Sequence, residues 1–260
     1  MKIDRDAVCA AFAAYVQAYD PSDPKIRLKI DHTYRVAALC AQLAESIALP
    51  DGDVDLAWLA GMLHDVGRFE QVRRWGTFND ALSVDHAALG ADLLFCEGHI
   101  RDYLADPAED DLLETAVRLH SAYRLPDSLT PRRRTFCDLL RDADKIDILR
   151  VNIDTPLTAI YNVSEEALAA AAFSPAVLEA FRAQHAVEKC LRRTPADALA
   201  GLLALTFELV YPASLRLVRE QGYLDRLLHF PTRNPDTARQ LLQMRAALNE
   251  YFCRRGTGPL

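Results

Sequence analysis

The residues best suited to chemistry in this chain lie in the stretch GMLHDVGRFE, which spans residues 61–70. It places His64 and Asp65 side by side at the end of an apolar run, just before Gly67. Neither side chain belongs in a core unless something compensates its buried polarity. Imidazole nitrogens and carboxylate oxygens are both good ligands for first-row divalent ions. The pair therefore points to a metal site, provided that other helices supply further ligands.

Further candidate ligands occur where histidine or aspartate shares a helical face with apolar residues, because such a face turns inward. These candidates are His32, His86, His120 and Asp144. A single histidine on an apolar face is more often a hydrogen-bonded core residue. An acid there often pairs with a neighbouring base, and Arg141 and Lys145 are close to Asp144 in sequence.

The joint pattern favours metal binding over these separate explanations. Four of the seven histidines and two aspartates take inward positions on five predicted helices. Burying so many titratable groups without a shared cation would be costly for each one. The predicted ligands are His32, His64, Asp65, His86, His120 and Asp144. The other histidines, at 99, 185 and 229, lack comparable surroundings, and we expect them to be structural.

The elements that must position these ligands are helices. Five predicted helix starts pair a good N-cap residue with proline at the first helical position; they are Asp23-Pro24, Thr130-Pro131, Ser174-Pro175, Thr194-Pro195 and Asn234-Pro235. Apolar residues recur at three- and four-residue spacing, and no sustained run alternates as a strand would. The sequence predicts an all-α fold with helices near 4–19, 24–48, 53–66, 83–97, 110–124, 131–151, 165–173, 175–191, 195–220 and 235–254.

The candidate ligands also suggest how the chain is organised. All of them precede residue 147, so we expect a metal-binding helical core over 1–160. Residues 161–260 would then form a C-terminal helical extension packed on that core as one compact unit. Pro212 should kink or split a long helix in the extension. In the core, RRWGTFND at 73–80 reads as a loop that lines a pocket.

Composition narrows the partners and the compartment. The net charge is −7, and the only basic run is Arg132-Arg133-Arg134, so we expect no nucleic-acid polymer as a partner. The six cysteines are isolated, with no CxxC pair, which favours reduced core thiols. No signal sequence or membrane-spanning stretch is evident, so we expect a cytoplasmic protein without membrane association. The oligomeric state stays open, and a homo-oligomer is one of the alternatives.

The order H…HD…D resembles the HD-domain superfamily of metal-dependent phosphohydrolases. The resemblance covers roughly residues 24–152 and rests on DHTYRVA, LHDVGRFEQ and RDADKIDIL, which contain His32, His64-Asp65 and Asp144. It implies an HD-type helical bundle in which these four residues hold one divalent ion and Asp65 bridges to a second. His86 in SVDHAALG and His120 in VRLHSAYRLP fit the dinuclear members.

The resemblance extends to one branch of the superfamily and excludes another. The chain is similar to a bacterial subgroup that carries HD-x-GRF followed by a GTF-containing loop. It lacks the GYP signature of the cyclic-dinucleotide branch, so that substrate class is not supported.

The function implied by this resemblance is hydrolysis of a phosphomonoester or phosphodiester in a small, nucleotide-like substrate. Two divalent ions (iron, manganese, another first-row metal, or magnesium) would share a bridging water and lower its pKa, yielding a hydroxide nucleophile. Asp65 would bridge the ions. His32, His64 and Asp144 would complete one ion, and His86 and His120 the other.

Residues near the ligands supply candidates for binding the substrate. Arg68 is the first candidate phosphate clamp, since guanidinium matches phosphate oxygens in bidentate geometry; a salt bridge to Glu70 or Asp80 is the alternative. Lys145 is a second substrate-binding candidate, and Asp147 is a candidate for orienting a ligating histidine. Arg27 and Lys29 are candidate entrance charges.

Two other function classes remain open at the level of sequence. HD sites with six ligands and two irons include oxygenases that cleave C–C or C–P bonds, and the ligand set alone does not separate them from hydrolases. A non-catalytic, ligand-binding HD domain is the third class, which only a turnover measurement excludes.

Overall fold

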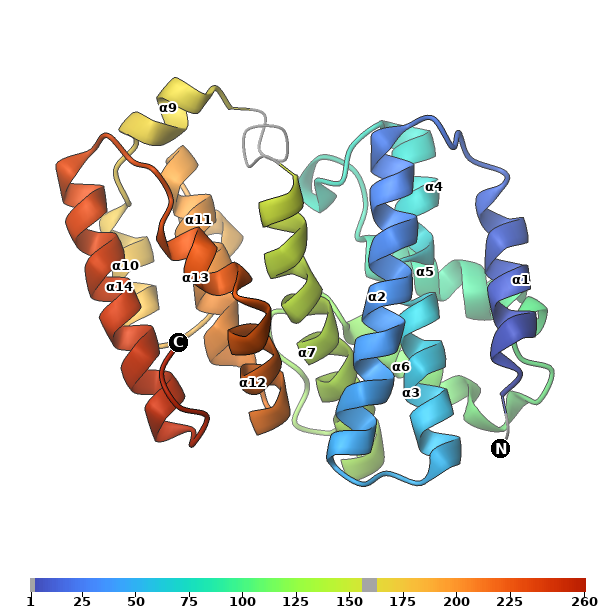
Figure 1. Ribbon diagram of the computed structural model, residues 1–260. Helices are drawn as coiled ribbons and strands as arrows, with labels where there is room; N and C mark the ends of the chain where they lie inside the picture. The colour runs from blue at the N-terminus through green and yellow to red at the C-terminus, as the bar shows by residue number, and fades with distance from the viewer. Residues whose placement is uncertain (1–2, 156–162) are drawn as a thin grey trace. The chain divides into compact units, whose positions relative to one another are not determined.

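The computed structural model describes residues 3–155 and 163–260, and all regular structure in these ranges is helical (Figure 1). The predicted all-α class is therefore confirmed. None of the described helices combines the length and the apolar character needed to cross a membrane.

The chain divides into two compact units, Met1–Asp144 and Lys145–Leu260. The predicted boundary between residues 160 and 161 lies outside the described residues. The first unit contains α1 (Arg5–Val16), α2 (Pro24–Ser46), α3 (Asp51–Leu63), α4 (Val66–Trp75), α5 (His86–Ala91), α6 (Asp110–Leu119) and the first part of α7 (Pro131–Asp154). Short turns of 3-10 helix (Asp80–Leu82, His99–Asp102, Pro107–Glu109) and a π-helical turn (Asp92–Cys96) connect α4, α5 and α6.

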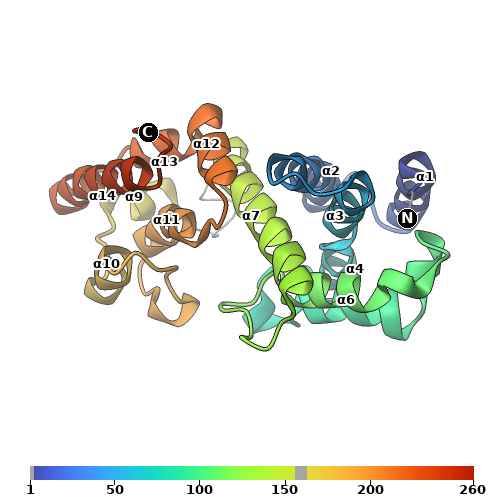
Figure 2. The same cartoon turned by 90° about the horizontal axis from the view of Figure 1, so that it is seen from below.

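In the first unit, helices α2 and α3 pack closely along each other and lie side by side in both views (Figures 1 and 2). Their close approach depends on Gly61, because a methyl group there would lie 2.5 Å from the Cα of Ala37. This contact brings the end of α3, where His64 follows, against the middle of α2, where His32 lies.

The second unit is built around α11 (Pro195–Ala204), in which every residue from Ala196 to Ala204 is buried. Its other helices are the end of α7, α9 (Glu165–Ala170), α10 (Pro175–Arg182), α12 (Pro212–Gln221), α13 (Tyr223–Leu228) and α14 (Pro235–Arg254), with 3-10 turns at Lys189–Leu191 and Leu205–Glu208. The start of α11 is held by Asp197, whose carboxylate accepts hydrogen bonds from Ser174, Arg193 and Thr194.

Several predicted helix boundaries are wrong, although all five proline-marked starts are confirmed. The helix predicted to end at 66 stops at Leu63, and α4 begins at Val66, so residues 73–75 of the predicted loop are helical. The helix predicted over 83–97 is a short α5 followed by the π-helical turn. The segment 195–220 is split, and Pro212 begins α12.

Candidate metal centre

Four of the six predicted ligands lie at helix ends in the first unit. His64 follows the last residue of α3, Asp65 precedes α4, His86 begins α5 and His120 follows α6. His32 comes from α2, and Asp144 lies on α7. The four histidines and Asp65 are each 4% exposed or less. The fold thus gathers these side chains around Asp65 in the interior.

The first group of converging atoms comprises His32, His64 and one oxygen of Asp65. The two Nε2 atoms lie 3.3 Å apart. Oδ2 of Asp65 is 3.6 Å from Nε2 of His32 and 3.4 Å from Nε2 of His64. Asp144 joins this side, with its Oδ1 3.1 Å from Nε2 of His32 and 3.9 Å from Nε2 of His64.

The second group uses the other oxygen of the same carboxylate. Nε2 of His86 lies 3.0 Å from Nε2 of His120. Oδ1 of Asp65 is 3.5 Å from Nε2 of His86 and 3.8 Å from Nε2 of His120. Both groups have the ligand spacing expected of a metal site, and Asp65 is the residue that they share.

Helix ends set the tautomers of two of these histidines. The last carbonyl groups of a helix have no partner within it. Nδ1 of His64 donates to the carbonyl of Gly61 at 2.7 Å, and Nδ1 of His120 donates to the carbonyl of Val117, also at 2.7 Å. With the proton on Nδ1, each ring presents a lone pair on Nε2 to the centre.

The second pair of rings leaves two lone pairs facing each other. Nδ1 of His86 is held by Oδ2 of Asp80 at 2.9 Å, so its Nε2 is also unprotonated. Burial, together with His86 and His64, lowers the pKa of His120 to about 3. Burial also lowers the pKa of His86. Two neutral acceptors 3.0 Å apart repel one another unless a cation lies between them.

The two carboxylates, in contrast to the neutral histidines, stay in their charged form. Burial alone would raise the pKa of Asp65, but Lys29, His64 and Arg68 outweigh burial and hold that pKa well below its usual range. Burial would likewise raise the pKa of Asp144, yet the hydrogen bond from His32 lowers it. Neutral imidazoles and ionised carboxylates are the protonation states that bind divalent ions.

The spacing of these atoms also fits a bound ion. Ligands about 2.0–2.2 Å from one ion, at angles of about 90–110°, are separated by roughly 3.0–3.5 Å. The edges of the two groups run from 3.0 Å to 3.8 Å. Small adjustments of the buried rings would complete either site.

Asp80 supports the second group by holding His86 through Nδ1, the ring nitrogen that does not face the centre. Its Oδ2 accepts the hydrogen bond from Nδ1 of His86, and its Oδ1 accepts from Arg68 at 2.8 Å and from Gln71 at 2.9 Å. Burial would raise the pKa of Asp80, but His86 and Arg68 lower it, so the carboxylate stays charged. A carboxylate in this position fixes the orientation of a ligating histidine and raises its basicity.

Two glycines allow α5 to bring His86 to the centre. A methyl group at Gly67 would lie 2.2 Å from the carbonyl oxygen of His86 and 2.6 Å from the backbone nitrogen of Gly90. A methyl group at Gly90 would lie 3.1 Å from the nitrogen of Gly67. The glycine two residues after Asp65 is therefore required for close helix packing.

Comparison with known families identifies the part of the chain that contains this centre. Residues 30–151 match the family model described as the HD domain. This part of the chain is an HD domain. No curated protein and no solved structure matches the chain. The predicted resemblance to the HD-domain superfamily is thus confirmed over these residues.

HD domains bind divalent metal ions, and this one has histidine and aspartate groups that could hold them. His32, His64, Asp65 and Asp144 belong to the first group, and Asp65, His86 and His120 to the second. The number and identity of the ions, and the role of each residue, remain predictions.

The predicted phosphate clamp lies beside the centre of the HD domain. Nε of Arg68 is 3.7 Å from Oδ1 of Asp65, while its Nη1 donates to Asp80, to Gln71 and to the carbonyl of Phe78. The alternative pairing with Asp80 is therefore present, whereas Glu70 pairs with Arg73 and Arg74. These contacts leave the role of Arg68 in binding phosphate as a prediction.

Sequence reasoning underestimated two residues of the HD domain. Nζ of Lys29 lies 2.6 Å from Oδ2 of Asp65, although Lys29 was expected only at the entrance. Its position one turn before His32 was an available signal, because residues three apart share a helix face. Asp80 could not be recognised in the same way, because it follows α4 at no helical spacing from His86.

The remaining candidates differ in their exposure to solvent. Arg27 is exposed, as an entrance charge would be. Lys145 and Asp147 are buried on α7 at the start of the second unit, and their roles stay predictions. The other three histidines, at 99, 185 and 229, are exposed and are not among the groups that could hold a metal in the described residues.

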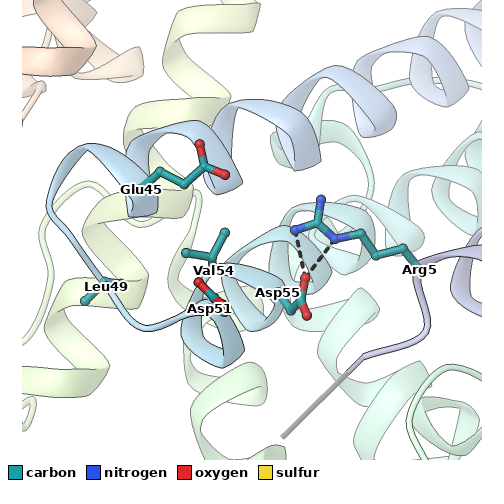
Figure 3. Close-up of a pocket in the computed structure, with 6 residues that line it drawn as sticks. All are labelled: Arg5, Glu45, Leu49, Asp51, Val54 and Asp55. Carbon is teal, nitrogen blue, oxygen red and sulfur yellow. Dashed lines mark hydrogen bonds and ion pairs between the residues drawn. The ribbon is translucent and has the colours of Figure 1, made fainter.

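A surface hollow in the first unit shares no residue with the centre. It is lined by Arg5, Glu45, Leu49, Asp51, Val54 and Asp55, and in Figure 3 the guanidinium of Arg5 reaches the carboxylate of Asp55. The Nη2–Oδ1 distance is 2.8 Å. The hollow has no histidine, and we assign it no chemistry.

Proposed function

We propose that this protein is a metal-dependent phosphohydrolase that uses two divalent ions to cleave a small phosphoester, with a nucleotide-like compound as the expected substrate. The observation that carries the proposal is the sharing of Asp65. Each of its oxygens faces a different pair of histidine nitrogens at 3.4–3.8 Å. A bridging carboxylate suits a pair of ions, and iron, manganese, another first-row metal or magnesium would fit these ligands.

Divalent ions bound at Asp65 would supply a nucleophilic water at neutral pH and polarise the phosphoryl group. The chain contributes the remaining requirements. The histidines and Asp65 are nearly inaccessible, so bulk water is excluded from the ligand side. Asp144, Lys29 and Arg68 keep 15%, 16% and 14% of their side chains exposed. The substrate would therefore enter on the side of these three residues, where two cations can hold its phosphate oxygens.

The test is a phosphate-release screen across nucleotides and simple phosphoesters, using protein loaded with manganese or magnesium. We expect turnover by the wild-type protein and none by Asp65→Ala, with circular dichroism showing that the variant keeps its helices. His99→Ala is the matched histidine control, because His99 is exposed and pairs with Asp102, away from the candidate ligands. It should behave as the wild type.

Three results would contradict the proposal. Retained phosphate release by Asp65→Ala would remove Asp65 from the chemistry. Oxygen consumption by the iron-loaded protein, without any phosphate release, would favour the dinuclear-iron oxygenase instead. Absence of any turnover would favour a ligand-binding domain.

A further inference from the structure

Lys29 is a half-buried cation beside the centre that the proposed ligand set leaves unexplained. It lies on α2, three residues before His32, and its Nζ donates to Oδ2 of Asp65 at 2.6 Å. Within the described residues, Asp65 is its only ion-pair partner. With 16% of its side chain exposed, Lys29 reaches from the buried carboxylate towards solvent.

Arg68 occupies the equivalent place on the other oxygen of the same carboxylate. Its Nε lies 3.7 Å from Oδ1 of Asp65. The ring of Phe78 contacts both cations, with its centroid 5.4 Å from Nζ of Lys29 and 5.7 Å from Cζ of Arg68. Cations at these distances are attracted to an aromatic ring. One aromatic side chain therefore positions two positive charges, one beside each half of the centre.

Binding of divalent ions would change the attraction between Asp65 and the side chains of Lys29 and Arg68. Without ions, the negative charge of Asp65 attracts both of them. With a divalent ion on each oxygen, the positive charge at Asp65 exceeds its negative charge, and the attraction becomes net repulsion. Arg68 keeps Asp80 as a partner at 2.8 Å. Lys29 has no second carboxylate partner among the residues that the structure describes, and its flexible stem allows the ammonium group to turn to an incoming anion.

We propose that Lys29 is a phosphate-binding residue of this site and that, with Arg68, it selects a phosphate dianion. The substrate class is then a phosphomonoester, whose terminal group has two negative charges, and not a phosphodiester, which has one. This inference rests on the proposed function. Lys29 and Arg68 match the two charges, and Phe78 keeps them on one side of the centre.

The experiment is calorimetric titration of the manganese-loaded protein with inorganic phosphate at about pH 8, where the probe is mostly dianionic. Dimethyl phosphate serves as the monoanionic probe. The wild type should bind inorganic phosphate more tightly. Lys29→Met should weaken inorganic phosphate by about 10- to 100-fold, the loss of one charge-assisted hydrogen bond. Lys29→Arg, which keeps the charge, should recover part of the affinity.

The matched control is Lys25→Met. Lys25 lies one turn earlier on α2 and donates to the carbonyl of Gly76, away from Asp65. Its removal should change phosphate affinity by less than about twofold. Manganese content is measured for every variant and should not fall in Lys29→Met, because Asp65 loses a competing cation.

Three results would overturn the inference: unchanged phosphate affinity in Lys29→Met, equal or tighter binding of dimethyl phosphate by the wild type, or loss of manganese from Lys29→Met. Loss of manganese would indicate that Lys29 supports Asp65 and does not bind phosphate. Failure of the proposed function is a separate result. In that case the wild type would bind phosphate in a Lys29-dependent way and yet release none from any ester.

Discussion

Replacement of Asp80 by asparagine tests how the second half of the centre is built. The carboxylate accepts from Nδ1 of His86 at 2.9 Å through Oδ2, and from Arg68 and Gln71 at 2.8 and 2.9 Å through Oδ1. An amide has one acceptor oxygen and one donor group. In Asp80→Asn, either His86 or the pair of Arg68 and Gln71 must therefore face a donor in place of an acceptor.

The expected magnitude follows from the loss at His86. Removing the carboxylate behind a ligating histidine lowers metal affinity by about 10- to 100-fold, or roughly 1.4–2.7 kcal/mol. The ring of His86 would also be free to move its proton to Nε2, which cannot then bind an ion. Asp80 supports His86 in the second group, so the first half of the centre, with His32 and His64, should keep its affinity.

The assay is calorimetric titration of chelator-stripped protein with manganese or zinc, fitted to two sites. Asp80→Asn should weaken one site and leave the other within about twofold, the scatter expected for an unaffected site. Asp85→Asn is the control, because Asp85 also neighbours His86 but caps α5, a task that asparagine performs equally well. If Asp80→Asn left both sites unchanged, or weakened both equally, the assignment of Asp80 to His86 would be refuted.

Two predictions concern the scaffold. Gly67→Ala places a methyl group 2.2 Å from the carbonyl of His86. It should lower the free energy of unfolding by about 1–3 kcal/mol in urea titration, and an unchanged midpoint would contradict the close approach of α4 and α5. Asp197→Asn should cost about 2 kcal/mol at neutral pH, because the carboxylate accepts from Ser174 and two backbone groups. Burial alone would raise the pKa of Asp197, but these hydrogen bonds outweigh burial and lower the pKa below its usual value. The contribution of Asp197 to stability is therefore complete above about pH 5 and is lost as the pH falls below about 4. Wild type and variant should therefore converge in stability on acidification, whereas a constant difference down to pH 2 would refute this role.

The helical class and many helix starts could be predicted because the signals are local. Proline at the first helical position with a capping residue before it marked Pro24, Pro175, Pro195 and Pro235 directly. Helix ends were less predictable. Apolar residues occur on both sides of His64 and Asp65, so nothing in the pattern shows that the chain turns there and starts α4 at once.

Residue types indicated which side chains make up the site, but they did not indicate which of these side chains contact one another. Histidine and aspartate on apolar faces indicated which side chains would meet, since few other arrangements satisfy buried titratable groups. The pairing of Lys29 with Asp65 and of Asp80 with His86 depends on how separate segments pack. The first pair is separated by 36 residues in the chain and the second by 6, and neither separation leaves a periodic signature in the sequence.

The central claim is that Asp65 is shared between two ion sites, and metal stoichiometry tests it most directly. Elemental analysis of saturated, desalted protein should find about two ions per chain in the wild type, as expected for a dinuclear site. His32→Ala and His120→Ala should each lose one ion, and Asp65→Ala should lose both. One ion in the wild type, or two retained in Asp65→Ala, would contradict the account.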